Sequence, residues 1–194
     1  MAIAAYNRLL ADREKDEDGS FYLLDINQDG VEELLYSRAP GGYMGYLEIY
    51  AYSNGSLVSD DIWYSIGSIT YKTNEKALLV ESSMQSEFKK SVFTFDGASL
   101  NHDYAAFSRL FEISPTEDLL PYGEFRIRML RYDGGNTYTD EGARRSYENY
   151  VDEWNAMQQL AMNYHCWQEE EGDITDIMLQ GTENTARNRR DFLR

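Results

Sequence analysis

Short apolar runs separated by turn residues fill the stretch from residue 20 to residue 135, and this pattern restricts the fold more than any other feature. From Met44 to Tyr52, side chains of two kinds alternate with the period of a strand. The dipeptides Asn54-Gly55 and Asp96-Gly97 favour tight turns of the I′ type between antiparallel strands. The sequence therefore predicts a meander of about six to nine antiparallel strands. The expected strands are 21–26, 31–37, 44–52, 62–71, 77–81, 125–129 and one that contains Phe93 and Phe95.

Helical periodicity marks both ends of the chain. Residues 2–12 repeat apolar side chains at spacings of three and four. A long helix of about six turns is expected from about 140 to 170. It begins with acidic residues that suit a first helical turn, and it has an apolar stripe on one face. The stripe consists of Tyr150, Trp154, Met157, Ala161 and Tyr164, and Gly172 is a plausible stop for this helix. A short helix over 173–180 and an arginine-rich tail follow it.

These patterns predict an α+β fold, namely a twisted antiparallel β-meander packed against an N-terminal helix and a long C-terminal helix. The length suits one domain over 1–194. Its segments are the helix and connection of 1–18, the antiparallel sheet of 20–135, and the helical segment and tail of 139–194.

Charge and composition exclude several classes of protein. The chain has 34 Asp and Glu against 18 Lys and Arg, a net charge of -16, which repels nucleic-acid phosphates and anionic lipid surfaces. We therefore expect no nucleic-acid partner. No apolar stretch approaches the roughly 20 residues of a membrane-spanning helix, so we also expect no membrane span. Cys166 is the only cysteine, which excludes a disulfide within the chain. No signal peptide is evident, although a secreted protein expressed without its leader would have the same sequence.

One segment carries metal chemistry, and it has the pattern D-x-N-x-D-G-x-x-E. Calcium takes six to eight oxygen ligands, and a tightly curled loop supplies them from alternate residues. Gly30 permits the sharp turn that such a loop needs. The sequence therefore predicts a structural Ca²⁺ site. Its ligands would be the side chains of Asp25, Asn27, Asp29 and Glu33 and the main-chain carbonyl of Val31.

The segment differs from an EF-hand. The twelfth position of an EF-hand loop is a bidentate Glu, whereas this chain has Tyr36 there. The flanking residues indicate strands, so we expect a strand-loop-strand calcium loop like those on β-propeller blades of the integrin type. A metal-free hairpin stays open as an alternative, because Asp and Asn side chains also cap backbone N–H groups in turns.

Four segments of the chain carry a resemblance to other proteins: Tyr6 to Leu10, Phe21 to Leu35, Leu47 to Leu57 and Ser146 to Trp154. Together they resemble an uncharacterised family of secreted proteins and lipoproteins from gut Firmicutes. That family has a helix, a strand pair with the same D-x-D/N-x-D-G-x-x-E-L motif, and an I-Y-x-Y-x-N-G-x-L hairpin. The resemblance implies an extracellular or cell-surface location and a calcium loop, and it implies no reaction. The resemblance makes a lipoprotein one expectation, but no lipobox cysteine is present, so lipid anchoring stays open.

Signatures of catalytic sites are scarce. The chain has no G-x-S-x-G elbow, H-E-x-x-H pair or phosphate-binding loop. His165 and Cys166 are sequence neighbours, and adjacent residues of a helix project about 100° apart. A His102–Cys166 dyad is an open alternative. On balance we predict a non-enzymatic protein with no catalytic residues.

Two other functions are open on the sequence alone. Tyr46, Tyr50 and Tyr52 share one strand face, and exposed tyrosines stack on sugar rings, which suggests a carbohydrate-binding or carbohydrate-active protein. The acidic run Glu169 to Glu171 and the basic tail suggest a protein-interaction module with a cell-envelope partner. The pattern specifies no oligomeric state.

Overall fold

The computed structural model describes residues 1–14, 19–38, 45–63, 65–84, 87–97, 99–108, 117–132, 139–165 and 182–193. Within these ranges the chain forms helices at both ends and strands between them, so the α+β class is confirmed. The helices are α1 (Ala2–Asp12), α2 (Tyr122–Tyr132), α3 (Asp140–Tyr164) and α4 (Ala186–Phe192). The strands are β1 (Ser20–Leu24), β2 (Glu33–Arg38), β3 (Tyr46–Ser53), β4 (Ser56–Trp63), β5 (Ser65–Lys72), β6 (Ala77–Met84), β7 (Glu87–Phe95), β8 (Leu100–Ser108) and β9 (Thr182–Glu183).

The chain divides into two compact units. The first comprises 1–82, 91–103 and 170–194, and the second comprises 83–90 and 104–169. The boundaries between the units fall inside β6, β7 and β8 and not only in connecting loops. The single domain over 1–194 stays a prediction.

The strands form two antiparallel sheets. The first has the order β4-β3-β2-β1-β9, in which β1 to β4 are a meander and the C-terminal strand β9 adds to the edge at β1. The second has the order β5-β6-β7-β8. The sequence predicted one strand over 62–71. This is wrong, because β4 ends at Trp63 in the first sheet and β5 begins at Ser65 in the second.

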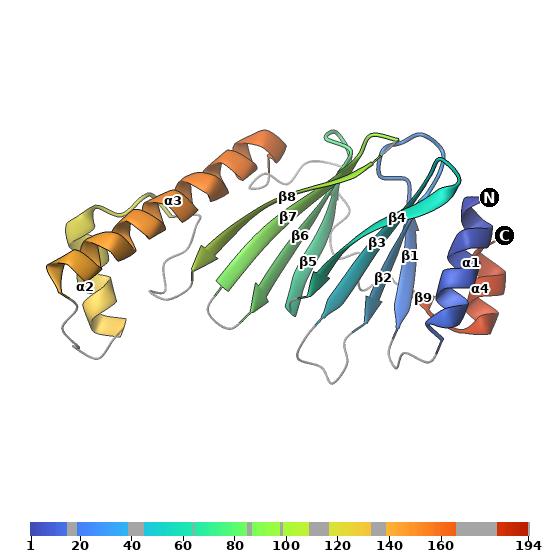
Figure 1. The fold of residues 1–194 in the computed structure, drawn as a ribbon, viewed down its shortest axis with the longest axis horizontal. Helices are drawn as coiled ribbons and strands as arrows, with labels where there is room; N and C mark the ends of the chain where they lie inside the picture. Colours follow the sequence, from blue (N-terminus) through green and yellow to red (C-terminus); the bar gives the residue numbers. More distant parts are fainter. Residues whose placement is uncertain are drawn as a thin grey trace. The chain divides into compact units, whose positions relative to one another are not determined.

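The first sheet is covered on both faces, and α1 and α4 lie beside it (Figure 1). Tyr6 and Leu10 of α1 are fully buried in a cluster on one face, together with Phe21, Leu34, Tyr36 and Tyr50 of the sheet and Leu193 after α4. Alternate residues such as Leu35, Leu47 and Ile49 point the other way, into a second cluster that includes Ile69, Tyr71, Leu78, Val80 and Phe93 of the second sheet. Double-sided burial explains why almost every residue of β2 and β3 is inaccessible to solvent.

Polar contacts fix the C-terminal segment on α1. Arg189 of α4 is buried and donates to the side chains of Asn184, at 2.8 Å, and Glu14, at 2.7 Å. Asn184 in turn donates to the carbonyl of Leu10 at 2.9 Å. The expected arginine-rich tail is therefore partly structural, because its central arginine lies in the interior of the first unit. Arg194 lies outside the described residues.

Of the two predicted type I′ turns, Asn54-Gly55 is confirmed and Asp96-Gly97 is not. Asn54 and Gly55 both have positive φ angles, 51° and 88°, as a type I′ turn requires. At the β7–β8 turn Gly97 has a positive φ, 84°, whereas Asp96 does not. There the Asp96 side chain accepts the Ser99 N–H at 2.8 Å. Asp96-Gly97 thus lies in a hairpin turn, but four residues separate β7 from β8 and the turn is not of the I′ type.

The strand predicted over 125–129 is wrong, since these residues lie in α2. Phe125 and Met129 are fully buried, whereas Ile127 between them is 53% exposed. A helix places residues four apart on one face, which satisfies the two buried side chains and turns the third outward. Pro121 directly before the helix and Glu124 in its first turn are start signals that outweigh the alternation.

The long helix α3 is shorter than expected. It begins with the Thr139 hydroxyl accepting the Gly142 N–H at 3.2 Å, and it ends at His165, which has a left-handed φ of 48°. Of the predicted stripe, Tyr150, Met157 and Ala161 are buried. The helix predicted over 173–180 and the stop at Gly172 lie outside the described residues.

Leu10→Ala tests the cluster under α1. The substitution removes a fully buried side chain, so we expect the free energy of unfolding in urea to fall by about 2–5 kcal/mol. Arg8→Ala, at an exposed position of the same helix, is the control and should change it by less than about 0.5 kcal/mol. Equal losses in the two variants would contradict this packing.

Candidate functional site

The segment 25–33 joins β1 to β2 and curls around the side chain of Asp25. The two carboxylate oxygens of Asp25 accept the backbone N–H groups of Asp29, at 3.0 Å, and Gly30, at 2.9 Å. Asn27 Oδ1 also accepts the Asp29 N–H, at 3.1 Å, and Asp29 Oδ1 accepts the Val31 N–H, at 2.8 Å. The side chains at alternate positions therefore organise the loop from inside, as the sequence pattern requires.

Two residues of the loop have left-handed backbone conformations. Gly30 has a φ of 87°, which confirms its predicted role in the sharp turn. Gln28 has a φ of 59°, which is uncommon for a residue with a side chain. The sequence gives no signal for the strain at Gln28, because Asn, Asp and Gly are the residues typical of this conformation.

Glu33 is the most unusual group of the site. It is the first residue of β2 and has no exposed surface. Its Oε2 accepts the Ile26 N–H at 2.8 Å, whereas Oε1 is buried without a hydrogen-bond partner among the described residues. Burial, opposed by the Ile26 hydrogen bond and reinforced by the Asp29 and Asp25 carboxylates, raises the pKa of Glu33 to about 7. A buried carboxylate in this position needs a proton or a cation.

Groups far away in the sequence hold the loop in place. The hydroxyl of Tyr6, on α1, donates to the Glu32 carbonyl at 2.9 Å. The hydroxyl of Tyr71, on β5, lies 3.1 Å from the Ile26 carbonyl, and Gln28 donates to the Thr73 carbonyl at 2.9 Å. Sequence reasoning missed these tyrosines, since nothing in the local pattern relates them to the loop.

The predicted ligand set stays a prediction. The described part of the chain contains no group of three or more His, Cys, Asp and Glu side chains that would hold a metal by themselves. A calcium ion here would thus depend on the Asn27 amide and the Val31 carbonyl beside the carboxylates of Asp25, Asp29 and Glu33. The hydrogen bonds of the loop also suit the metal-free hairpin, and the partnerless oxygen of Glu33 is the feature that this alternative does not explain.

The carbohydrate hypothesis assumed that the tyrosine face of β3 is exposed, but only Tyr52 of its three tyrosines is partly exposed. Tyr46 and Tyr50 are buried, with 8% and 6% of their surface exposed. Glu48 between them accepts from the Tyr46 hydroxyl at 2.8 Å and from Arg13 at 2.6 Å, and Arg13 also donates to the Tyr50 hydroxyl at 3.0 Å. Burial and the Glu48 carboxylate raise the pKa of Tyr46 to about 12. This buried polar cluster has no room for a stacked sugar on Tyr46 or Tyr50.

His102 does not have the surroundings of a catalytic base. It lies on β8, stacks on Phe93 with ring centroids 4.2 Å apart, and places Nδ1 3.0 Å from Asp60 on β4. Its Nε2 atom is buried and so does not reach a substrate. The pairing instead links a strand of each sheet within the first unit. The other member of the proposed dyad, Cys166, lies outside the described residues.

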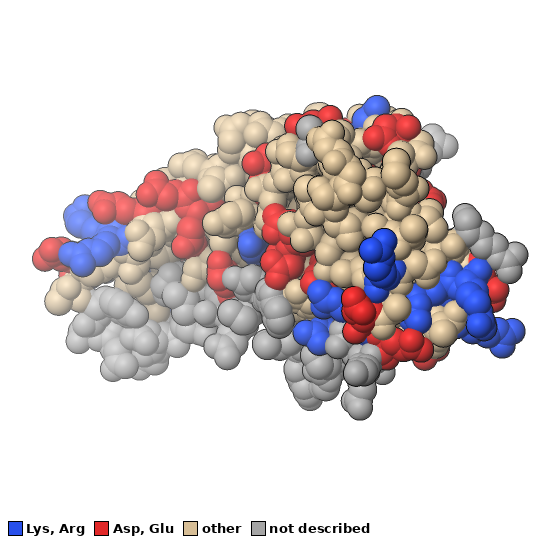
Figure 2. Space-filling view, turned by 45° about the vertical axis from the view of Figure 1, so that its right-hand side comes forward, with Lys and Arg blue, Asp and Glu red and all other residues tan. Residues whose placement is uncertain are grey.

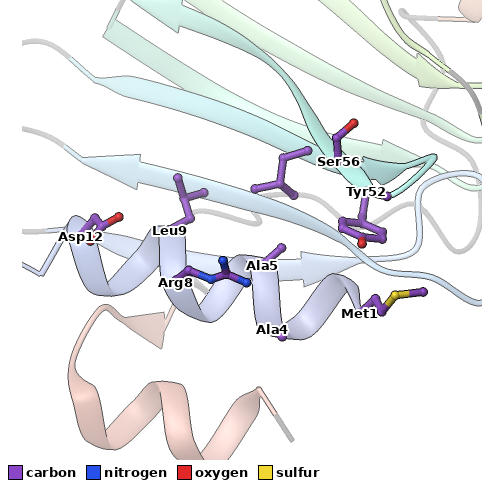
Figure 3. Close-up of a pocket in the computed structure, with 10 residues that line it drawn as sticks. Met1, Ala4, Ala5, Arg8, Leu9, Asp12, Tyr52 and Ser56 are labelled. Carbon is purple, nitrogen blue, oxygen red and sulfur yellow. The ribbon is translucent and has the colours of Figure 1, made fainter.

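A cavity of about 540 Å³ opens between α1 and the β3–β4 hairpin (Figure 3). Met1, Ala5, Leu9, Tyr52 and Leu57 give it a largely apolar lining, to which Arg8, Asp12 and Ser56 add polar groups. The cavity is distant in sequence from the 25–33 loop, and its residues match no catalytic constellation. We therefore assign it no ligand.

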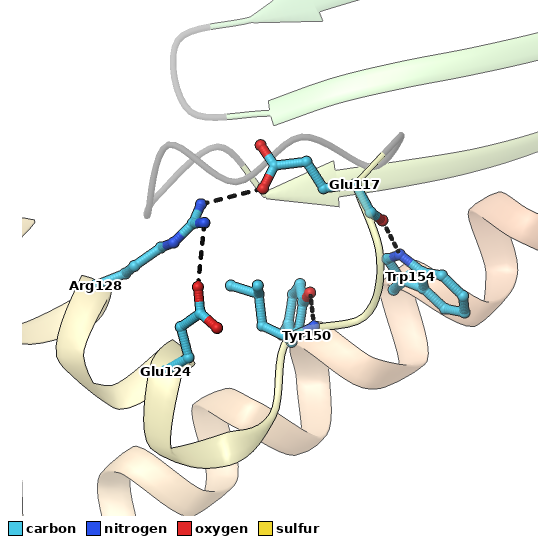
Figure 4. A network of polar contacts seen from close by, with 6 residues as sticks. Glu117, Glu124, Arg128, Tyr150 and Trp154 are labelled. Atoms are coloured by element: carbon cyan, nitrogen blue, oxygen red, sulfur yellow. Dashed lines mark hydrogen bonds and ion pairs between the residues drawn. The ribbon is translucent and has the colours of Figure 1, made fainter.

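The second unit contains a polar network around the start of α2 (Figure 4). Arg128 lies 3.2 Å from Glu117 and 3.5 Å from Glu124, and Trp154 of α3 donates to the Glu117 carbonyl at 3.0 Å. The Leu120 N–H donates to the Tyr150 hydroxyl at 2.9 Å. These contacts attach the segment before α2 to α3 and have the character of structural ion pairs and hydrogen bonds.

The surface charge is uneven. In the view of Figure 2, Lys and Arg side chains form separate groups at the lower right and at the left-hand end, and acidic side chains lie among and between them. Arg187 and Arg190 are exposed on α4, unlike the buried Arg189 between them. The acidic run Glu169 to Glu171, which suggested an interaction module, lies outside the described residues.

Comparison with known proteins gives no match: no family model, curated protein or solved structure is similar to this chain. Among the described helices, none combines the length and the apolar character needed to cross a membrane.

The buried carboxylate predicts a pH dependence of the metal-free protein. Because the pKa of Glu33 is about 7 in the folded state against 4.5 as the reference value, the folded state binds more protons between these pH values. Its contribution to stability is present below pH 4.5 and is lost as the pH rises to 7, a decline on the order of 3 kcal/mol at most. Urea denaturation in EGTA measures this decline.

Glu33→Gln is the matched variant for this measurement. It keeps the shape of the side chain but cannot ionise, so the difference in unfolding free energy between wild type and variant should narrow towards low pH. A constant difference over the whole range would contradict the raised pKa.

Proposed function

We propose that this chain is a non-enzymatic bacterial protein of the cell exterior whose 25–33 loop binds a structural Ca²⁺ ion. The observation that carries the proposal is the fully buried Glu33, whose Oε1 has no hydrogen-bond partner in the described structure, beside a loop lined with oxygen atoms. A divalent cation would neutralise this carboxylate and the two neighbouring aspartates. Calcium fits because it accepts oxygen ligands in number and with flexible geometry.

The role of the ion would be to stabilise the β1–β2 hairpin. Glu33 pairs with Leu24 as the last pair of the β1–β2 ladder, so the loop closes the first hairpin. An ion bound by Asp25, Asn27, Asp29, Glu33 and the Val31 carbonyl would join the end of β1 to the start of β2. The first hairpin of the five-stranded sheet would then be held by a metal in addition to its backbone hydrogen bonds.

The proposed location rests on the resemblance to secreted proteins and lipoproteins. Extracellular modules bind calcium in the range of about 10⁻⁴–10⁻³ M, and we expect this loop to bind it in that range. A loop with three formal charges and one neutral amide suits such moderate affinity. A glycan or a cell-envelope protein as partner stays a hypothesis without support from the geometry, since the tyrosines that suggested the first are largely buried.

A calcium titration tests the proposal. We expect heat on titration and a higher melting temperature in Ca²⁺ than in EGTA, because a ligand at 100 times its Kd stabilises the folded state by about 2.7 kcal/mol. Asp25→Asn should weaken binding at least about tenfold, since it removes a charge from the centre of the loop.

Asp12→Asn, which changes an exposed carboxylate on α1, is the control and should bind calcium as the wild type does. Absence of heat together with an unchanged melting temperature would refute the calcium site. The metal-free hairpin would then be the correct interpretation of the loop.

A further inference from the structure

The 25–33 loop has contacts with the second sheet that a simple hairpin does not need. Gln28 lies at the tip of the loop, and its Nε2 donates to two groups, the Tyr71 hydroxyl at 3.1 Å and the Thr73 carbonyl at 2.9 Å. Both acceptors belong to β5 or to the turn that follows it. The only strained non-glycine residue of the loop is thus the one that reaches across to the other sheet.

Tyr71 completes the connection from its side. Its hydroxyl accepts from Gln28 and has one proton to donate, which it shares between the carbonyls of Ile26, at 3.1 Å, and Asp25, at 3.3 Å. The ring is buried, with 6% of its surface exposed, in the cluster between the two sheets. The phenol therefore has little freedom to follow the loop if the loop changes conformation.

We infer that calcium binding at the 25–33 loop is energetically coupled to the second sheet, through Tyr71 and Gln28, so that the ion fastens β5 to the first sheet. The inference rests on the proposed calcium site. An ion bound by Asp25 and its neighbours would restrict the backbone of Asp25 and Ile26, whose carbonyls accept from the Tyr71 hydroxyl. Because this backbone could no longer move with Tyr71, β5 could separate from the first sheet only by breaking these hydrogen bonds. Tyr71 and Gln28 are positioning residues, since neither is a predicted ligand.

The coupling is reciprocal, which makes it measurable from both ends. If calcium lowers the equilibrium constant for separation of β5 from the first sheet by some factor, loss of the β5 contacts must raise the Kd for calcium by the same factor. Couplings between sites are commonly between about 5- and 150-fold. A purely local metal site would slow exchange within 20–38, and elsewhere only at amides that exchange through global unfolding, all of them by the same factor.

Hydrogen exchange of the full chain, with Ca²⁺ and with EGTA, tests this inference. In the wild type, calcium should slow amide exchange in 20–38 and also, by about fivefold or more, in 65–72. In Tyr71→Phe the slowing in 20–38 should persist, the slowing in 65–72 should fall below about twofold, and the Kd for Ca²⁺ should rise about fivefold or more.

Two further variants distinguish a specific coupling from general destabilisation. Gln28→Asn retains a residue that tolerates the left-handed backbone but shortens the side chain, so it should reproduce the loss of coupling even if Tyr71→Phe does not fold. Tyr22→Phe makes the same chemical change in a partly buried tyrosine that packs on the same cluster, and it should behave as the wild type.

The outcomes separate this inference from the proposed function. Calcium binding with slowed exchange in 20–38 alone, in the wild type, would overturn the coupling and leave the calcium site intact. Loss of coupling in Tyr22→Phe to the same degree as in Tyr71→Phe would overturn the assignment to the phenol contact. Absence of any calcium binding in the wild type would refute both.

Discussion

Glu33 places a carboxylate at a position without contact to solvent, and the organisation of the first hairpin depends on how that group is satisfied. One oxygen accepts the Ile26 N–H, and the other is buried without a hydrogen-bond partner in the described structure. The cost of an uncompensated buried charge is high enough that such groups take up a proton or pair with a cation. The raised pKa and the calcium hypothesis are therefore two consequences of the same burial.

Burial of this carboxylate follows from the packing of the first sheet. Because α1 packs on one face of the first sheet and residues of the second sheet pack on the other face, almost no residue of β2 and β3 is exposed to solvent. Polar residues on these strands must consequently be satisfied from within. Glu48 is paired through Oε1 with Arg13 and Tyr46, although its Oε2, like Glu33 Oε1, is buried without a hydrogen-bond partner among the described residues, whereas Glu33, at the end of its ladder, has no basic partner in the described structure. The position of each glutamate along its strand thus decides its role: Glu48, inside β3, forms a structural ion pair, and Glu33, at the start of β2, is a candidate metal ligand.

The sequence predicted the local features of both the fold and the site. Helix 2–12, the Asn54-Gly55 turn and the acidic first turn of α3 follow from propensity, turn chemistry and the helix dipole, which act over a few residues. The oxygen-rich loop was also visible, because alternate spacing and Gly30 are properties of consecutive residues. Where two local signals competed, as in 125–129, alternation over five residues was the weaker one, and the start signals at Pro121 and Glu124 identify the helix.

Interactions between distant segments were decided by the tertiary structure alone. No spacing rule relates Tyr71 to Asp25, Arg189 to Glu14, or Tyr50 to α1, since these contacts depend on which faces meet when the chain folds. The sequence by itself determined the class of fold and the curled loop with its oxygen atoms, since these come from backbone preferences and short-range hydrogen bonds. Packing determined that the tyrosine face is buried, that the strand over 62–71 divides between two sheets, and that one carboxylate of the loop lies in the interior, because burial is a property of the assembled layers.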